Sequence, residues 1–160
     1  MDNITLKALA KINLGLDVVR RREDGYHEVR MIMQTIHLYD KLDIKKTTES
    51  GIAITSNLSY VPTNENNLVY KAGKLLMGEF DIKEGVSVHL QKRIPVAAGM
   101  AGGSSDAAAM LYGMNQIFDL GLSRKELMER GVKIGADVPY CLMRGTALAE
   151  GIGEKLTSLP

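Results

Sequence analysis

The chain has 160 residues, of which 45% are hydrophobic and 24% are charged, and these proportions are typical of a soluble globular protein. Its formal net charge is only +1, so the overall charge gives no support for a nucleic acid or an anionic membrane as the partner. The single cysteine, Cys141, cannot form an internal disulfide, which favours a reducing, cytoplasmic environment. The first 16 residues carry scattered charges and no continuous apolar run, so neither a signal peptide nor a membrane-spanning helix is expected there.

The first third of the chain is predicted to form strands. Alternation over residues 6–18 predicts a half-buried strand whose open, polar face carries Lys11 and Asn13 side by side. The opposite, core-facing side of that strand is predicted to hold Ala8, Ala10, Ile12, Leu14, Leu16 and Val18. A charged turn containing Asp-Gly is predicted at 20–25, followed by two separate strands at 30–38 and 41–46 that are joined near Tyr39.

The remaining elements mix strands with helices. A strand is predicted at 51–57, a helix after the polar loop 61–67, and another strand at 86–90. Helical spacing returns after residue 106, and Ser123 with Glu126 predicts the start of a further helix by a capping box. Strands first and mixed elements later predict one α+β domain over residues 1–160, a two-layer fold with a mixed sheet and helices on one face.

The segment PVAAGMAGGSSDAAA, residues 95–109, lies between a predicted strand and a predicted helix. Its glycines let the main chain approach a ligand closely. Ser104, Ser105 and Asp106 stand where the helix N-cap is expected, so free amides at the positive end of the helix dipole would face outward. Phosphate binding is one interpretation, and a tight turn chosen for packing is the other. A Walker loop is excluded because the segment has no lysine, and GMAGGS is not a GxGxxG dinucleotide pattern.

Three segments resemble one family, in the order that the family has them. The pattern P-x-x-x-G-M-x-G-G-S-S-x-A-A at 95–108 is similar to the ATP-phosphate loop of the GHMP kinases, a superfamily of small-molecule kinases. AKINLGLDVVRRREDGYHEV at 10–29 and GADVPYCL at 135–142 resemble signature segments of its 4-diphosphocytidyl-2-C-methyl-D-erythritol kinases. The departures, Met100 for leucine and Tyr140-Cys141 where phenylalanines are frequent, change no polar group. The resemblance implies the GHMP kinase N-terminal fold, which is like domain 2 of ribosomal protein S5.

The same resemblance implies an activity and a set of roles. It implies that ATP, with Mg²⁺, phosphorylates the 2-hydroxyl of 4-diphosphocytidyl-2-C-methyl-D-erythritol in non-mevalonate isoprenoid biosynthesis. Asp137 would accept the hydroxyl proton, and Lys11 would hold the hydroxyl. Asn13 would bind near that hydroxyl, Tyr26 would stack on the cytosine, and His27 would hydrogen-bond to the base. ATP contacts are implied for Asn67, Lys92, Pro95, Val96, Ala97, Ala98, Gly99, Met100, Ala101, Gly102, Gly103, Ser104 and Ser105. No metal ligand is assigned.

Simpler interpretations exist for the same residues. Asp137 could merely cap the helix after it, Lys11 could be a solvated surface lysine, and Tyr26 with His27 could pack beneath a hairpin. Two rival functions also remain. A GHMP kinase of the homoserine or mevalonate type is disfavoured because DGYHE suits a nucleobase pocket, and a non-catalytic, S5-like RNA- or partner-binding domain is disfavoured by the near-zero charge and by the presence of both Lys11 and Asp137.

GHMP kinases are two-domain proteins nearly twice as long as this chain, with the active site in the cleft between the two halves. The resemblance therefore implies that the C-terminal GHMP domain is absent from this chain. We expect the 160-residue chain to be inactive by itself, because one wall of the cleft would be missing. We also expect it to expose apolar surface that favours self-association.

Overall fold

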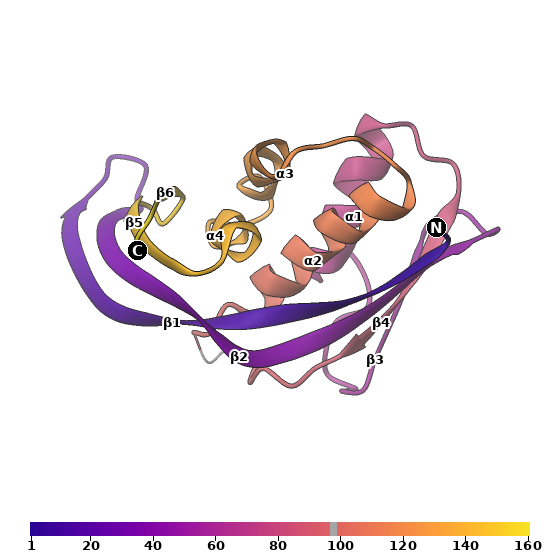
Figure 1. Cartoon of the computed structure of the whole chain (residues 1–160), viewed down its shortest axis with the longest axis horizontal. Coiled ribbons are helices and arrows are strands. Elements are labelled where there is room, and N and C mark those ends of the chain that lie inside the picture. Colours follow the sequence, from indigo (N-terminus) through magenta and orange to yellow (C-terminus); the bar gives the residue numbers. More distant parts are fainter. Residues whose placement is uncertain (97–98) are drawn as a thin grey trace.

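The structure is a computed structural model that describes residues 1–96 and 99–160. Within these residues a six-stranded mixed sheet curves around four helices, all of which lie on its concave face (Figure 1). The strands are β1 (Asn3–Arg21), β2 (His27–Thr47), β3 (Ile52–Ser56), β4 (Gly85–Gln91), β5 (Thr146–Gly151) and β6 (Lys155–Ser158). The helices are α1 (Leu68–Glu79), α2 (Gly102–Ile117), α3 (Arg124–Gly131) and α4 (Val138–Met143). The predicted α+β fold with helices on one face is confirmed.

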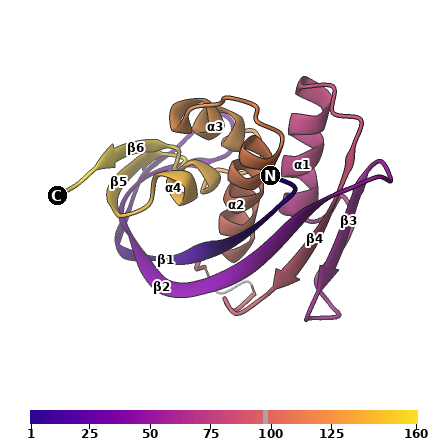
Figure 2. The ribbon, with the colours of Figure 1, turned by 45° about the vertical axis from the view of Figure 1, so that its right-hand side comes forward.

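The sheet is organised around β2. Antiparallel β1 runs along one edge of β2, while β4 and β5 pair with the two halves of the other edge. β3 adds to β4 in parallel and β6 adds to β5, so the order is β3-β4-β2-β5-β6, with β1 beside β2. Figure 2 shows how the β1–β2 ribbon sweeps beneath α2 and then curls toward β5 and β6.

The prediction of two strands at 30–38 and 41–46 is wrong, because β2 is one continuous strand of 21 residues. Tyr39 and Asp40 were expected to form the join, yet they pair with Leu9 and Ala8 inside the ladder. Asp40 reads as a turn residue, but its side chain is fully buried and its carboxylate accepts hydrogen bonds there. A buried carboxylate with donors is tolerated inside a strand.

The predicted faces of the first strand are also partly wrong. The register of β1 against β2 shifts between Leu9 and Lys11, so that Ala10 and Lys11 are both buried although they are consecutive. Such a β-bulge breaks the alternation of faces and bends the strand. Beyond it Leu14 and Val18, which were expected in the core, are each 60% exposed, and Ile12 is 36% exposed. The structure does not describe the side chain of Leu16, the remaining residue of this predicted face.

Helices α1 and α2 pack side by side on the sheet and form most of the core with it. Gly113 lets α2 come close, because a Cβ atom there would lie 2.5 Å from Cδ1 of Ile44. The predicted capping box at Ser123 and Glu126 is present at the start of α3. In the part of the chain that the structure describes, no helix is long and apolar enough to cross a membrane.

Candidate functional site

A cavity of about 350 Å³ lies between the loop that precedes α1 and the glycine-rich segment that precedes α2. It is lined by Tyr60, Val61, Pro62, Asn66, Asn67, Leu68, Lys92, Pro95, Val96, Gly99, Met100, Ala101, Gly102, Gly103, Ser104 and Asp106. Every predicted ATP contact that the structure describes is therefore at this cavity, except Ser105. The predicted contacts Ala97 and Ala98 lie outside the described residues.

The wall opposite the glycine-rich segment was missed by sequence reasoning. Tyr60, Val61 and Pro62 belong to the polar loop before α1, where only Asn67 was singled out. Asn67 is the N-cap of α1 and its side chain accepts a hydrogen bond from the amide of Val69, at 2.9 Å. Tyr60 lies in the loop that leads to this N-cap, but a tyrosine in a polar loop does not say which other segment it faces.

The N-terminus of α2 opens into the cavity. The predicted N-cap at Ser104–Asp106 is wrong, because the helix begins at Gly102 and Ala101 takes the N-cap position with φ of 58°. The first intrahelical bond runs from the Ser105 amide to the Ala101 carbonyl, at 2.8 Å. The amides of residues 102–104 precede it and have no carbonyl to bind within the helix. These amides, at the positive end of a 16-residue helix, are suited to an anion.

Two hydrogen bonds tie the glycine-rich segment to β1. The Lys11 amide donates to the Met100 carbonyl at 3.1 Å, and the Ser105 hydroxyl donates to the Leu9 carbonyl at 2.7 Å. Ser105 is buried by this contact and points away from the cavity, so the structure does not bring it to the other predicted ATP contacts. The hydrogen bond from the Ser105 hydroxyl to the Leu9 carbonyl holds α2 against β1.

Lys11 is not the solvated lysine of the simpler interpretation. It is only 5% exposed because of the bulge at Ala10, and its ammonium donates to Oδ1 of Asn13 at 3.1 Å. Asn13 itself is exposed. The expected neighbourhood of Lys11 and Asn13 is present, because the register of β1 is regular between these two residues and places both on one face.

Asp137 takes the N-cap position of α4, yet its side chain makes no capping hydrogen bond. The interpretation of this carboxylate as a helix cap is therefore wrong. The residue is half-buried, and a Cβ atom on Gly153 would lie 3.9 Å from its Oδ1, which places Asp137 against the β5–β6 turn. Its carboxylate remains available for another donor.

Lys11 and Asp137 come into electrostatic range of one buried thiol. Burial is the main cause that raises the pKa of Cys141 to about 12; the charge of Asp137 raises it further, and that of Lys11 lowers it. Both charges therefore lie near Cys141, although the described residues form no direct Lys11–Asp137 ion pair. The fold thus brings Lys11 and Asp137, which are far apart in the sequence, near this thiol.

This environment predicts an unreactive cysteine. At pH 8 a thiol with a pKa of about 12 has roughly a thousandfold less thiolate than one with the ordinary value of 9.0, so Cys141 should alkylate slowly in the folded chain. Iodoacetamide labelling followed by mass spectrometry should show slow reaction in buffer and fast reaction in urea. Equal rates in both conditions would contradict the burial of Cys141, and slow labelling otherwise serves as a check that a variant is folded.

Tyr26 and His27 lie at the tip of the β1–β2 hairpin, where Gly25 adopts φ of 88° to close the turn. Tyr26 is 61% exposed and His27 is exposed too, so they do not pack beneath the hairpin. The tip is remote from the lining of the 350 Å³ cavity, but it lies beside the end of β5, because Val29 pairs with Gly151. The structure therefore does not join these two residues to the predicted ATP contacts.

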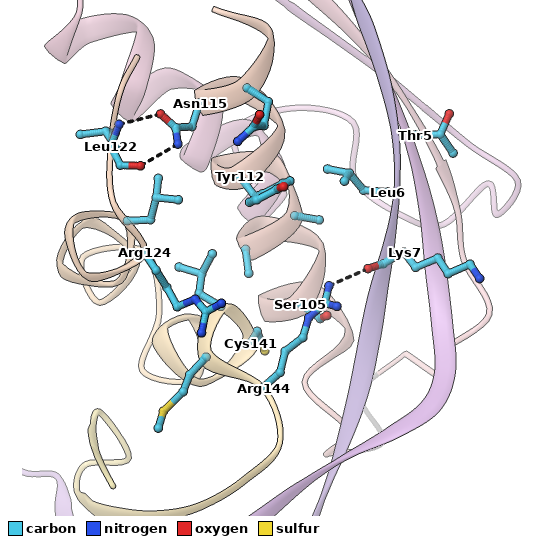
Figure 3. Close-up of a pocket in the computed structure, with 16 residues that line it drawn as sticks. Thr5, Leu6, Lys7, Ser105, Tyr112, Asn115, Leu122, Arg124, Cys141 and Arg144 are labelled. Atoms are coloured by element: carbon cyan, nitrogen blue, oxygen red, sulfur yellow. Dashed lines mark hydrogen bonds between the residues drawn. The ribbon is translucent and has the colours of Figure 1, made fainter. Parts of the chain in front are cut away.

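A second, larger cavity of about 690 Å³ opens between β1 and the helices α2, α3 and α4 (Figure 3). Ser105 and Cys141 lie on its lining, and the side chains of Arg124 and Arg144 lie over it. Arg144 donates to the Lys7 carbonyl at 3.1 Å. None of the proposed catalytic or substrate-binding residues line this cavity. Among the described residues no cluster of three or more His, Cys, Asp or Glu could hold a metal ion.

An α+β domain with a glycine-rich helix N-terminus at a cavity is an arrangement that suits a phosphate ligand. Residues 67–145 match the family model "GHMP kinases N terminal domain". The chain belongs to the GHMP kinase superfamily and has the fold of its N-terminal domain.

Relatives within that superfamily are closer still. The chain is 64% identical, over all of its 160 residues, to a protein of Lachnoclostridium phytofermentans named 4-diphosphocytidyl-2-C-methyl-D-erythritol kinase. It is 62% identical, again over its whole length, to the protein of that name from Lachnospira eligens. It spans 55% and 56% of these two relatives, so it corresponds to about half of their length.

Solved structures show the same similarity to GHMP kinases. A crystal structure of 4-(cytidine 5'-diphospho)-2C-methyl-D-erythritol kinase superposes with a TM-score of 0.84 at 37% identity, over 98% of this chain and 55% of the other. A homoserine kinase from Cytophaga hutchinsonii superposes with a TM-score of 0.74 at 20% identity, over all of this chain and 52% of the other, a likeness of fold alone. The predicted family resemblance is confirmed.

Proposed function

We propose that this chain is the ATP-binding part of a kinase that phosphorylates the 2-hydroxyl of 4-diphosphocytidyl-2-C-methyl-D-erythritol in isoprenoid biosynthesis. The observation that carries the proposal is the cavity in which the predicted ATP contacts meet the free amides of α2. The names of the relatives supply the acceptor. The division of labour between this chain and a C-terminal GHMP domain is part of the proposal, as is a cytoplasmic location.

ATP would lie with its phosphates at the α2 N-terminus. The amides of residues 102–104 would hydrogen-bond to phosphate oxygens, and the helix dipole would favour their negative charge. Tyr60, Val61 and Pro62 give the opposite wall an apolar surface that suits a purine ring. ATP would bind as its magnesium complex, in which the metal offsets phosphate charge, and no residue is assigned as a magnesium ligand.

The acceptor hydroxyl would lie between Lys11 and Asp137. Asp137, which makes no capping bond, would accept the hydroxyl proton as the oxygen attacks the γ-phosphate. Lys11 would stabilise the developing negative charge on that oxygen, since its buried ammonium is already oriented by Asn13. Tyr26 and His27 would take the cytosine at the hairpin tip, some distance along the same ribbon from Lys11.

Exposed apolar side chains on the outer half of the hairpin also support the expectation of self-association. Leu14, Val18, Val19 and Tyr26 are all more than half exposed. Exposed apolar residues gathered on one ribbon favour burial against another protein surface. Light scattering across a range of concentrations would show whether the 160-residue chain associates with itself.

Binding and turnover test the proposal separately. MgATP at about a hundred times its Kd should raise the melting temperature of the chain by about 5–10 °C. The chain extended by the second half of the L. phytofermentans relative should phosphorylate the cytidyl substrate, while the 160-residue chain alone should not. Comparable turnover from both proteins would contradict the expectation that the 160-residue chain is inactive because it lacks one wall of the active-site cleft. Stabilisation by RNA and not by MgATP would favour the non-catalytic alternative, and turnover of homoserine or mevalonate would favour another GHMP kinase.

A further inference from the structure

Three charged side chains meet in the interior beneath the glycine-rich segment. Lys92, just after β4, donates from its ammonium to Oδ2 of Asp40 on β2 at 2.6 Å and to Oδ2 of Asp106 on α2 at 2.7 Å. The exposed fractions of the three side chains are 6%, 0% and 4%. Lys92 was predicted only as an ATP contact, and neither carboxylate was given a role from the sequence. The two carboxylates of this largely buried cluster have no role in the proposed reaction so far.

The charges of this cluster do not balance if both carboxyl groups are ionised. One ammonium would then face two carboxylates in a largely buried site, and an uncompensated buried charge is strongly unfavourable. Asp40 is well suited to be the anion, because it also accepts from the amides of Arg93 at 2.6 Å and Ile94 at 2.8 Å. Asp106 is poorly suited to be the anion, because its Oδ1 is buried and has no hydrogen-bond partner among the described residues. The geometry therefore places the neutral carboxyl on Asp106.

The electrostatic directions agree with that assignment. Burial is the largest cause that raises the pKa of Asp106 well above its ordinary value, and a hydrogen bond with Asp40 adds to it. For Asp40, burial also opposes ionisation, but hydrogen bonds from Asp106, Lys92 and the two amides outweigh it, so its pKa is lowered. The other titratable group in electrostatic range of Asp106 is Cys141 on α4, which is neutral because burial raises its pKa to about 12.

The cluster holds both ends of the glycine-rich segment. Asp40 binds the amides of Arg93 and Ile94, where the chain enters the segment, and Asp106 lies in the second turn of α2, where it leaves. Lys92 links the two, and a Cβ atom on Gly102 would lie 3.3 Å from its Nζ. The three side chains therefore lie directly behind the amides that face the cavity.

We propose that Asp40, Lys92 and Asp106 form a charge-neutral clamp, with Asp106 protonated, that positions the α2 N-terminus for a polyphosphate. The ligand's identity rests on the proposed function, whereas the clamp and its proton do not. A neutral clamp matters because a net negative charge behind these amides would repel the phosphates that they bind. Asp106 is thus a positioning residue, which acts through Gly102, Gly103 and Ser104.

Asp106→Asn tests the proton without any ligand. Asparagine has the shape of a protonated aspartate, and its carbonyl oxygen can still accept from Lys92. Because the native pKa of Asp106 is raised, this residue contributes most to stability below the unfolded value of 3.8, and the contribution is lost as the pH rises through the native pKa. The melting temperature of Asp106→Asn, relative to that of the wild type, should therefore increase as the pH rises from about 4 to about 9.

Asp81→Asn is the matched control, because Asp81 is exposed and also carries a carboxylate. Its melting temperature should follow that of the wild type throughout the titration. If Asp106 were instead an ionised partner of Lys92, Asp106→Asn would lose an ion pair, and its melting temperature would fall further behind the wild type as the pH rises. That opposite trend would overturn the proposal.

The second measurement concerns the amides themselves. Asp106→Leu removes the acceptor for Lys92, so hydrogen exchange at residues 102–104 should quicken and the Kd for MgATP should rise about tenfold or more, while Asp106→Asn should stay within about twofold of the wild type. Slow labelling of Cys141 checks the fold, and if Asp106→Leu does not fold, the pH series of Asp106→Asn decides. Unchanged exchange in a folded Asp106→Leu overturns the clamp. Absence of MgATP binding by the wild type would contradict the proposed function alone, since the stability and exchange results need no nucleotide.

Discussion

Asp137→Asn is expected to lower kcat by about 10²-fold or more in the chain extended by the second half of a relative, while nucleotide binding stays nearly intact. Asparagine keeps the size of the side chain but cannot accept the hydroxyl proton. Because the Asp137 side chain makes no capping bond to α4, its replacement should leave that helix in place. Steady-state kinetics with MgATP and the cytidyl substrate, together with calorimetric titration of MgATP, would measure the two effects separately.

Asp17→Asn provides the control for this experiment. Asp17 lies on β1 like Lys11, but it is exposed and remote from the cavity lining, so its replacement should change kcat little. The melting temperature and the labelling rate of Cys141 should be close to those of the wild type in both variants. An unchanged kcat in Asp137→Asn would show that another group accepts the proton.

Gly103→Val is expected to weaken MgATP binding by roughly ten- to a hundredfold, with much less effect on the cytidyl substrate. A Cβ atom on Gly103 would lie 3.7 Å from Leu68, an ordinary contact, so a side chain can begin at this position without a clash at Cβ. It would nevertheless stand at the mouth of the cavity and hinder phosphates from approaching the amides. Gly102 is a poorer choice, because a Cβ atom there would press on Ile94 at 3.2 Å.

Tyr26→Ala is the matched counterpart of Gly103→Val. It should weaken the cytidyl substrate by about 1–3 kcal/mol if base stacking is the role of Tyr26, and leave MgATP unaffected. Tyr26 is exposed at the hairpin tip, so its loss should not disturb the core. Calorimetry of both ligands with both variants gives four values. Equal loss of both ligands in Gly103→Val would indicate a misfolded domain and would contradict a specific role for the loop.

The local elements of the fold were predictable wherever neighbouring residues decide the outcome. The capping box at Ser123, the hairpin turn at Gly25 and the alternation in β4 all depend on side chains within a few positions. The continuity of β2 and the bulge in β1 were not predictable, because they depend on distant partners. Asp40 stays in the strand only because Lys92 and the amides after it satisfy its carboxylate.

The site divides in the same way. The glycine-rich segment could be identified because its residues are contiguous, so a motif of tiny residues before a helix carries the phosphate interpretation. The opposite wall at Tyr60, and the partnership of Asp40 with Asp106, arise only when separate segments fold together. Ser105 illustrates the limit within the motif itself, since only the packing of α2 on β1 turns its hydroxyl away from the cavity.

The length of β2 also constrains how this domain can vary. β4 and β5 share one edge of β2, with partners at residues 41–47 and 29–34, while β1 occupies the other edge throughout. A single residue inserted between those two stretches would rotate one half of β2 by one side-chain position relative to the other, so that inward and outward faces would exchange on that half. The hairpin tip and the buried Asp40 therefore share a single register, and changes in length between them are tolerated only in pairs or with a compensating bulge in β1.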